Sequence, residues 1–167
     1  MKDARDVYRE RTWAPTWVWA LLSVVGLASV GGVLLGGEEA ASPWLVVVGA
    51  LLVGLVSCFS RLDVEVLRRS LRVGFGPVRV ARKHIAYGDI ESARPVKYRP
   101  VRDFGGWGIR WRGGKTAWTI RGNRAVRVRL RSGKRIFVGS EHSQRLAYRV
   151  QAAAELERRA QRRRKAR

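Results

Sequence analysis

Thr12 to Gly37 reads TWAPTWVWALLSVVGLASVGGVLLGG, Ala40 to Ser60 reads AASPWLVVVGALLVGLVSCFS, and neither stretch contains a charged residue. They are 26 and 21 residues long. The hydrocarbon core of a bilayer is about 30 Å thick, so a helix rising 1.5 Å per residue needs about 20 apolar residues to cross it. The two stretches therefore predict two membrane-spanning helices, at about 17–35 and 43–59, joined as a hairpin.

Tryptophans mark the edges of these stretches. Three of them cluster at the start of the first stretch and one opens the second: Trp13, Trp17, Trp19 and Trp44. An indole ring favours the boundary between membrane and water, because it joins an apolar body to one polar N–H group. Their positions agree with the predicted spans.

The charge is unevenly distributed along the chain. The net charge is +21, and residues 61–167 hold 30 Lys and Arg against eight Asp and Glu. The segment between the spans carries only Glu38 and Glu39. Because basic segments stay on the cytoplasmic side, the pattern predicts a multi-pass protein of the inner (plasma) membrane with both termini in the cytoplasm. A cleaved signal peptide is the alternative for the first stretch, but its apolar run is too long and a second span follows at once.

Small residues recur at every fourth position in both predicted spans. They are Ala28, Gly32 and Gly36 in the first span, and Ala50, Gly54 and Cys58 in the second. Such stripes allow helices to approach closely. The favoured interpretation is packing of the two helices within one hairpin, and the alternative is a contact face for a second copy of the chain.

From Arg61 the hydrophobic period changes to two, which indicates strands with one buried face. The clearest strand spans 124–130, and its partner holds Ile136 and Val138. A three-residue loop with Gly133 in the left-handed conformation would pair Val128 with Ile136 and Val126 with Val138. About seven short antiparallel strands are expected in all, in a small, strongly bent sheet.

One amphipathic helix is expected to close the domain. Ser140 has the character of a helix cap, and Leu146, Val150 and Ala154 follow helical spacing. The predicted organisation is an N-terminal arm at 1–12, the helical hairpin at 13–60, a mainly β domain at 61–156 and a basic tail at 157–167.

Several short motifs occur in a characteristic order along this chain. They are Tyr8-Arg9-Glu10-Arg11 with Trp13 and Pro15, then Gly74-Phe75-Gly76-Pro77, Phe104-Gly105-Gly106-Trp107-Gly108-Ile109-Arg110, Gly122-Asn123-Arg124-Ala125-Val126, and Ser132-Gly133-Lys134-Arg135 running to Val138-Gly139-Ser140. In this order the chain resembles bacterial pleckstrin-homology-like membrane proteins with two N-terminal spans. The resemblance implies a PH-like fold and a membrane location, and it implies no activity.

The residues that usually carry catalysis are few and scattered. His84 and His142 lack orienting partners in the sequence, and Asp63 with Glu65 is expected to form a solvated face opposite nearby arginines. No nucleotide-binding, zinc or nucleophile motif occurs, and the single cysteine, Cys58, excludes an intrachain disulfide. The sequence therefore predicts a non-enzyme with no catalytic residues, no cofactor and no metal.

Two basic clusters are the candidate binding residues. One comprises Arg127, Arg129, Arg131 and Arg135, and the other comprises Arg110, Arg112, Lys115 and Arg121. The expected function is a non-catalytic membrane protein whose basic PH-like domain binds anionic membrane lipids or another envelope protein, as a scaffold or accessory component. The alternative is contact with RNA or ribosomes, with tryptophans among the arginines stacking on bases.

Overall fold

A computed structural model describes residues 8–35, 43–76 and 81–166. The first sheet is antiparallel, with strand order β1-β2-β3-β4. Its strands are β1 (Tyr8–Trp13), β2 (Arg61–Val66), β3 (Ser70–Phe75) and β4 (Ala81–Ala86). The strands predicted to follow Arg61 begin with β2 and β3.

The second sheet has the strand order β5-β8-β9-β7-β6. Its strands are β5 (Ile90–Lys97), β6 (Gly108–Arg112), β7 (Lys115–Thr119), β8 (Arg124–Leu130) and β9 (Arg135–Gly139). All neighbours are antiparallel except β7 and β9, which run parallel. The fold is therefore two sheets, one of them mixed, where one bent antiparallel sheet was predicted.

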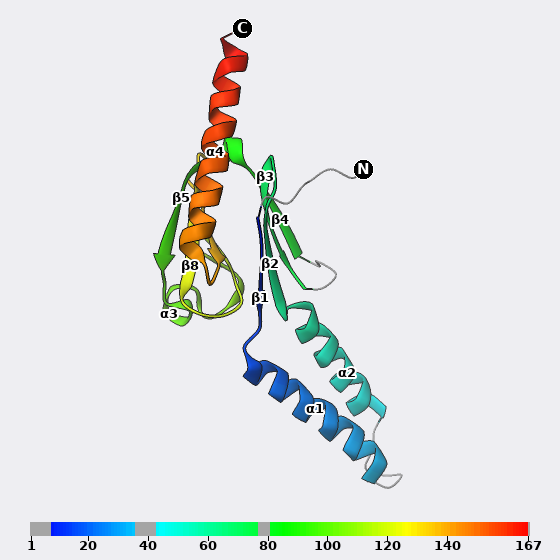
Figure 1. The fold of residues 1–167 in the computed structure, drawn as a ribbon. Coiled ribbons are helices and arrows are strands. Elements are labelled where there is room, and N and C mark those ends of the chain that lie inside the picture. Colours follow the sequence, from blue (N-terminus) through cyan, green and yellow to red (C-terminus); the bar gives the residue numbers. More distant parts are fainter. Residues whose placement is uncertain (1–7, 36–42, 77–80, 167) are drawn as a thin grey trace.

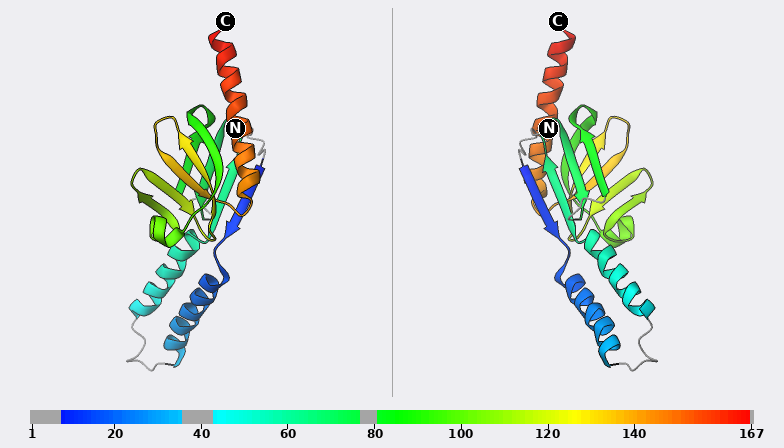
Figure 2. Two further views of the ribbon diagram at one scale, coloured as in Figure 1. Left: turned by 90° about the vertical axis from the view of Figure 1, so that its left-hand side faces the viewer. Right: turned by 90° about the vertical axis from the view of Figure 1, so that its right-hand side faces the viewer.

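Helices lie at both ends of this β structure (Figure 1). They are α1 (Thr16–Leu35), α2 (Pro43–Cys58), the 3-10 turn η1 (Tyr87–Asp89), α3 (Pro100–Phe104) and α4 (Ser143–Lys165). The α1 and α2 helices lie side by side and extend away from the sheets, whereas α4 runs along β5 and β8 and continues beyond them (Figures 1 and 2).

The core lies between the two sheets. Leu62, Val64 and Val73 from the first sheet meet Val126 and Val128 from the second, and all five are fully buried. The alternation of apolar and polar residues along these strands predicted which side chains face inward. Leu146, Val150 and Ala154 of α4 complete this core, as the helical spacing indicated.

The β8–β9 hairpin confirms the predicted register. Val128 pairs with Ile136, Val126 pairs with Val138, and Gly133 has a φ of 80°. The N–H groups of Leu130 and Gly133 donate to the carbonyls of Lys134 and Leu130 and close the loop. This local arrangement followed from the sequence because a shift of one residue would turn every apolar side chain toward solvent.

The two uncharged stretches form α1 and α2, but not membrane spans. Within the ranges that the structure describes, no helix is both long and apolar enough to cross a membrane. The α2 helix has 16 residues and rises about 24 Å, against a hydrocarbon core about 30 Å thick. The predictions of a two-span transmembrane hairpin and of a multi-pass inner-membrane location with cytoplasmic termini are therefore wrong.

The small-residue stripes do not lie between α1 and α2. Ala28, Gly32, Ala50 and Gly54 are exposed. Among the described residues, no atom outside the helix's own nearby backbone lies within 4 Å of a Cβ placed on Gly32 or Gly54. Gly36, the remaining helix-packing candidate, lies outside the described residues. A contact with a second copy through these stripes stays a prediction.

Residues 8–12, expected to belong to a charged arm, are part of the sheet. Strand β1 pairs with β2 along its whole length, so that Glu10 lies opposite Val64 and points to the core side. The Oε2 atom of Glu10 accepts a hydrogen bond of 2.7 Å from the hydroxyl of Ser140. Its Oε1 atom accepts from the N–H groups of Glu141 and His142, at 2.8 and 3.4 Å. A carboxylate of the first strand thus caps the start of the last helix.

Tyr8 completes this arrangement. Its hydroxyl donates to Oε2 of Glu10 at 3.1 Å. Burial, followed by the Glu10 charge and this hydrogen bond, raises the pKa of Tyr8 to about 12. The Tyr8 hydroxyl therefore stays protonated and available as a donor to Glu10 at neutral pH.

Asp63 and Glu65 are buried, which corrects the prediction of a solvated face. Their side chains are only 3% exposed, because arginines cover them. Arg9 and Arg72 lie 2.6 and 3.2 Å from Glu65, and Arg61 lies 3.1 Å from Asp63. The sequence predicted arginines opposite these two carboxylates. It did not show that β1 would bring Arg9 to the same side of the first sheet.

The α4 helix continues through most of the predicted basic tail. It ends at Lys165, and Arg158 donates to the carbonyl of Ile90 at 2.6 Å. Arginine is a strong helix former, so the helix continues where polar residues predominate.

We expect Glu10→Ala to lower the free energy of unfolding by about 2–4 kcal/mol, because it leaves buried donors at the start of α4 without an acceptor. Glu155→Ala, on the exposed side of α4, is the matched control and should change it by less than about 0.5 kcal/mol. Urea denaturation of the full chain measures both. Equal effects would contradict the capping role of Glu10.

Candidate functional site

Two adjacent rows of basic side chains lie on the side of the second sheet that faces away from the main core. One row contains Arg94, Arg127, Phe137, Ala117 and Arg110 on successive strands from β5 to β6. The next row contains Ser92, Arg129, Arg135, Lys115 and Arg112. Residues that pair across neighbouring strands share one face of a sheet. We call this surface the basic sheet face; its members are Arg94, Arg110, Arg112, Lys115, Arg127, Arg129 and Arg135.

The structure thus unites most of the two predicted clusters. The parallel pairing of β7 with β9 places Lys115 opposite Arg135, and β6 then adds Arg110 and Arg112. Sequence reasoning missed Arg94, which lies directly opposite Arg127. The alternation of side chains along β5 places Arg94 on an exposed side of that strand. Nothing in the sequence near Arg94 indicated that β5 would pair with β8.

Two predicted residues lie elsewhere. Arg121 forms an ion pair with Glu141, with 2.7 Å between its Nε and a carboxylate oxygen. Arg131 donates from its Nε to the carbonyl of Gly88 at 2.9 Å. Both guanidinium groups hold parts of the domain together and are not members of the basic sheet face.

Acidic partners on this face are few. Arg129 pairs with Glu91 at 2.9 Å, and both side chains are exposed. Asp103 lies beside a cavity of about 450 Å³ that Arg112 and Lys115 also line. Among the described residues, Arg94, Arg127 and Arg135 form no ion pair. The face therefore keeps a strong net positive charge.

A second, smaller core supports these charges. Tyr98, Phe104, Ala117 and Ala125 are buried together, with Phe137 packed against them. The Phe104 and Phe137 rings lie 5.1 Å apart in an edge-to-face arrangement. The short helix α3 contributes Phe104 and so fixes one end of the basic sheet face.

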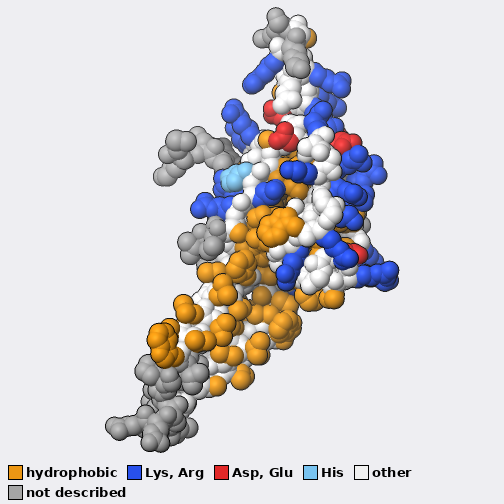
Figure 3. Space-filling view, turned by 180° about the vertical axis from the view of Figure 1, so that it is seen from behind, with side chains coloured by type: hydrophobic (Ala, Val, Ile, Leu, Met, Phe, Trp, Pro, Cys, Tyr) orange, Lys and Arg blue, Asp and Glu red, His pale blue; other side chains and the backbone are white. Residues whose placement is uncertain are grey.

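The space-filling view separates charged and apolar surfaces (Figure 3). Lys and Arg side chains gather over the β domain and α4, whereas hydrophobic side chains cover α1 and α2. Trp17, Leu27, Trp44 and Leu51 are among the exposed residues of these two helices. An exposed apolar surface of this kind is typical of a region that contacts a partner.

The tryptophans are not arranged as a stacking platform on the basic sheet face. Trp111 is 73% exposed, but it pairs with Thr116 and lies on the opposite side of β6 from Arg110. Trp118 is buried against Phe75, and the indole of Trp107 donates to the carbonyl of Gly122. Phe137 does lie in one of the rows of this face, but its ring packs against Phe104 and Tyr98 in the small core and is partly buried. None of the tryptophans is therefore placed to stack on bases between these arginines.

The histidines and carboxylates are dispersed. His142 is the N-cap residue of α4, and His84 is an exposed residue of β4. The described ranges contain no group of three or more His, Cys, Asp or Glu placed to hold a metal ion. Asp63 and Glu65 are each occupied by arginines.

These features define a mainly β protein with two packed sheets, a long C-terminal helix and a basic sheet face. Residues 7–97 match a protein family described as "Protein of unknown function (DUF3093)", and the chain belongs to this family. No curated protein matches the chain. The matched residues end with β5, so among the basic sheet face they contain only Arg94.

Arg94 and Arg127 are like charges directly opposite each other, which destabilises a sheet by about 0.2–1 kcal/mol. We expect Arg127→Gln to raise the free energy of unfolding by a few tenths of a kcal/mol at low salt. At about 0.5 M salt the gain should shrink because exposed charges are screened. Arg121→Gln, which removes the same charge but breaks an ion pair, should produce no gain. Denaturant unfolding at both salt levels tests this, and a loss of stability in Arg127→Gln would contradict it.

Proposed function

We propose that this protein is a non-catalytic binding protein whose basic sheet face binds the headgroups of anionic phospholipids. The observation that carries the proposal is the alignment of seven basic residues in two adjacent rows with one ion pair among them. The resemblance of the β domain to PH-like domains is part of the proposal, and the two packed sheets closed by α4 support it.

The geometry favours a broad anionic surface as the partner. The rows extend across all five strands, so the charges are spread over a sheet and do not converge on one point. Each Lys or Arg near an anionic lipid surface contributes about 1 kcal/mol to the binding free energy. This contribution decays with distance from the surface, over about 10 Å at 0.1 M salt. A scaffold role, in which an acidic protein takes the place of the lipid, uses the same side chains.

RNA is the weaker candidate. Sequence-independent binding of single strands combines a positive groove with aromatic side chains on which bases stack. The basic sheet face supplies the charge, but Trp111 lies on the other side of β6. An RNA strand on this face would be held by contacts to its phosphates alone, and the affinity of such contacts falls steeply as the salt concentration rises.

The test compares vesicles of phosphatidylglycerol in phosphatidylcholine with vesicles of phosphatidylcholine alone. The difference between them isolates the contribution of charge from that of the exposed apolar helices. We expect the combined variant Arg127→Gln, Arg129→Gln and Arg135→Gln to weaken the charge-dependent part of vesicle binding by about 100- to 200-fold, as three lost contributions of about 1 kcal/mol each predict.

The matched control neutralises three exposed arginines of α4, by Arg159→Gln, Arg162→Gln and Arg163→Gln. It removes the same charge and should weaken binding much less. Equal losses in the two variants would exclude a specific role for the basic sheet face. Tighter binding to RNA than to anionic vesicles, at about 0.15 M salt, would exclude lipid as the partner.

A further inference from the structure

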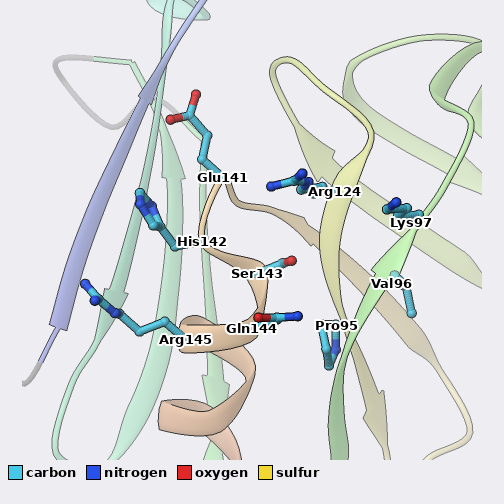
Figure 4. A pocket seen from close by; sticks show the side chains of 9 residues that line it. All are labelled: Pro95, Val96, Lys97, Arg124, Glu141, His142, Ser143, Gln144 and Arg145. Carbon is cyan, nitrogen blue, oxygen red and sulfur yellow. The ribbon is translucent and has the colours of Figure 1, made fainter.

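A second surface lies at the start of α4, away from the basic sheet face. A cavity of about 590 Å³ opens between the first turn of this helix and the ends of β5 and β8 (Figure 4). Lys97 and Arg124 pair across these two strands, on the same side of the sheet as the core residue Val126. The basic sheet face occupies the other side, so the cavity is a separate site.

Ser143, the first residue of α4, is directed into this cavity. Its side chain lies on the side of the helix that faces Arg124 and Lys97 (Figure 4). The residue is only 8% exposed, and its hydroxyl forms no hydrogen bond within the described residues. The hydroxyl lies on the wall of the cavity and can donate to and accept from a molecule within it. Ser143 thus offers one polar group to a ligand that enters the cavity.

The backbone adds further donors at the same place. Glu10 occupies the N–H groups of Glu141 and His142, and the first hydrogen bond of α4 runs from the N–H of Leu146 to the carbonyl of His142. The N–H groups of Ser143 and Gln144 have no acceptor within the helix. The partial positive charge of a helix N-terminus favours anions, and α4 has 23 residues.

The charges around the cavity suit an anion. Arg124 of β8 and Lys97 of β5 both line the cavity, on the wall across from Ser143 (Figure 4). Neither cation has an ion-pair partner among the described residues. Glu141, which lines the cavity, pairs with Arg121 and turns away from Ser143 (Figure 4), and Glu10 accepts from Ser140 and the N–H groups before α4.

We propose that this cavity binds the phosphate monoester of a small organic molecule. Arg124 and Lys97 neutralise the phosphate, while the Ser143 hydroxyl and the N–H groups of Ser143 and Gln144 donate hydrogen bonds to its oxygens. The cavity is larger than a phosphate ion requires, and Pro95 and Val96 give its wall an apolar part for the organic group.

The experiment titrates the ¹⁵N-labelled full chain with phenyl phosphate and, in a second arm, with inorganic phosphate. We expect saturable shifts of the Ser143 and Gln144 amide signals, with tighter binding of the monoester. Arg124→Gln should weaken binding about tenfold or more, because it removes a charge-assisted hydrogen bond. Ser143→Ala should weaken it about fivefold, and Ser143→Thr, which keeps the hydroxyl, should restore most of the affinity.

Arg129→Gln is the matched control, because it removes one arginine from the basic sheet face and leaves the cavity intact. It should reduce vesicle binding but leave the affinity for phenyl phosphate unchanged. Failure of the proposed lipid binding can therefore be distinguished from failure of the proposed phosphate site. Equal weakening in Arg129→Gln and Arg124→Gln would overturn the site. Shifts that do not saturate, or that sulfate and chloride reproduce, would show an adventitious ion only and would also overturn it.

Discussion

Glu10 is 8% exposed, and a carboxylate at that depth is stable only when hydrogen bonds replace the water it has lost. Besides the neighbouring Tyr8 hydroxyl, its donors come from Ser140, Glu141 and His142, about 130 residues further along the chain. Because β1 belongs to the first sheet and these donors precede α4, one side chain joins the two ends of the fold. The position of α4 also determines where Ser143 and the cavity beside it lie.

The core and the basic sheet face are two consequences of the same strand alternation. Val126 and Val128 point inward, so Arg127 and Arg129 must point outward. The pairing order then brings basic residues from all five strands onto one surface, at a cost in like-charge repulsion. This repulsion is the basis for proposing an anionic partner, and the small core around Phe104 and Phe137 supports the charged surface from one end.

The two uncharged stretches show the limit of reading hydropathy alone. Their lack of charge predicted helices, and α1 and α2 are helical. A helix that crosses a membrane must in addition be long and apolar enough, and no helix within the described ranges meets both conditions. Likewise, the fourth-position stripes suggested a helix contact, yet Gly32 and Gly54 face open space although the helices lie side by side.

The sequence by itself determined the features that depend on neighbouring residues. The period of two specified the strands and their inward side chains, Gly133 specified the β8–β9 loop and its register, and helical spacing specified the buried side of α4. Only the tertiary structure decided which strands became neighbours, because strand pairing depends on contacts between distant segments and carries no local signal. It thereby placed Arg94 beside Arg127, buried Asp63 and Glu65 beneath arginines, and directed the carboxylate of Glu10 to the start of α4.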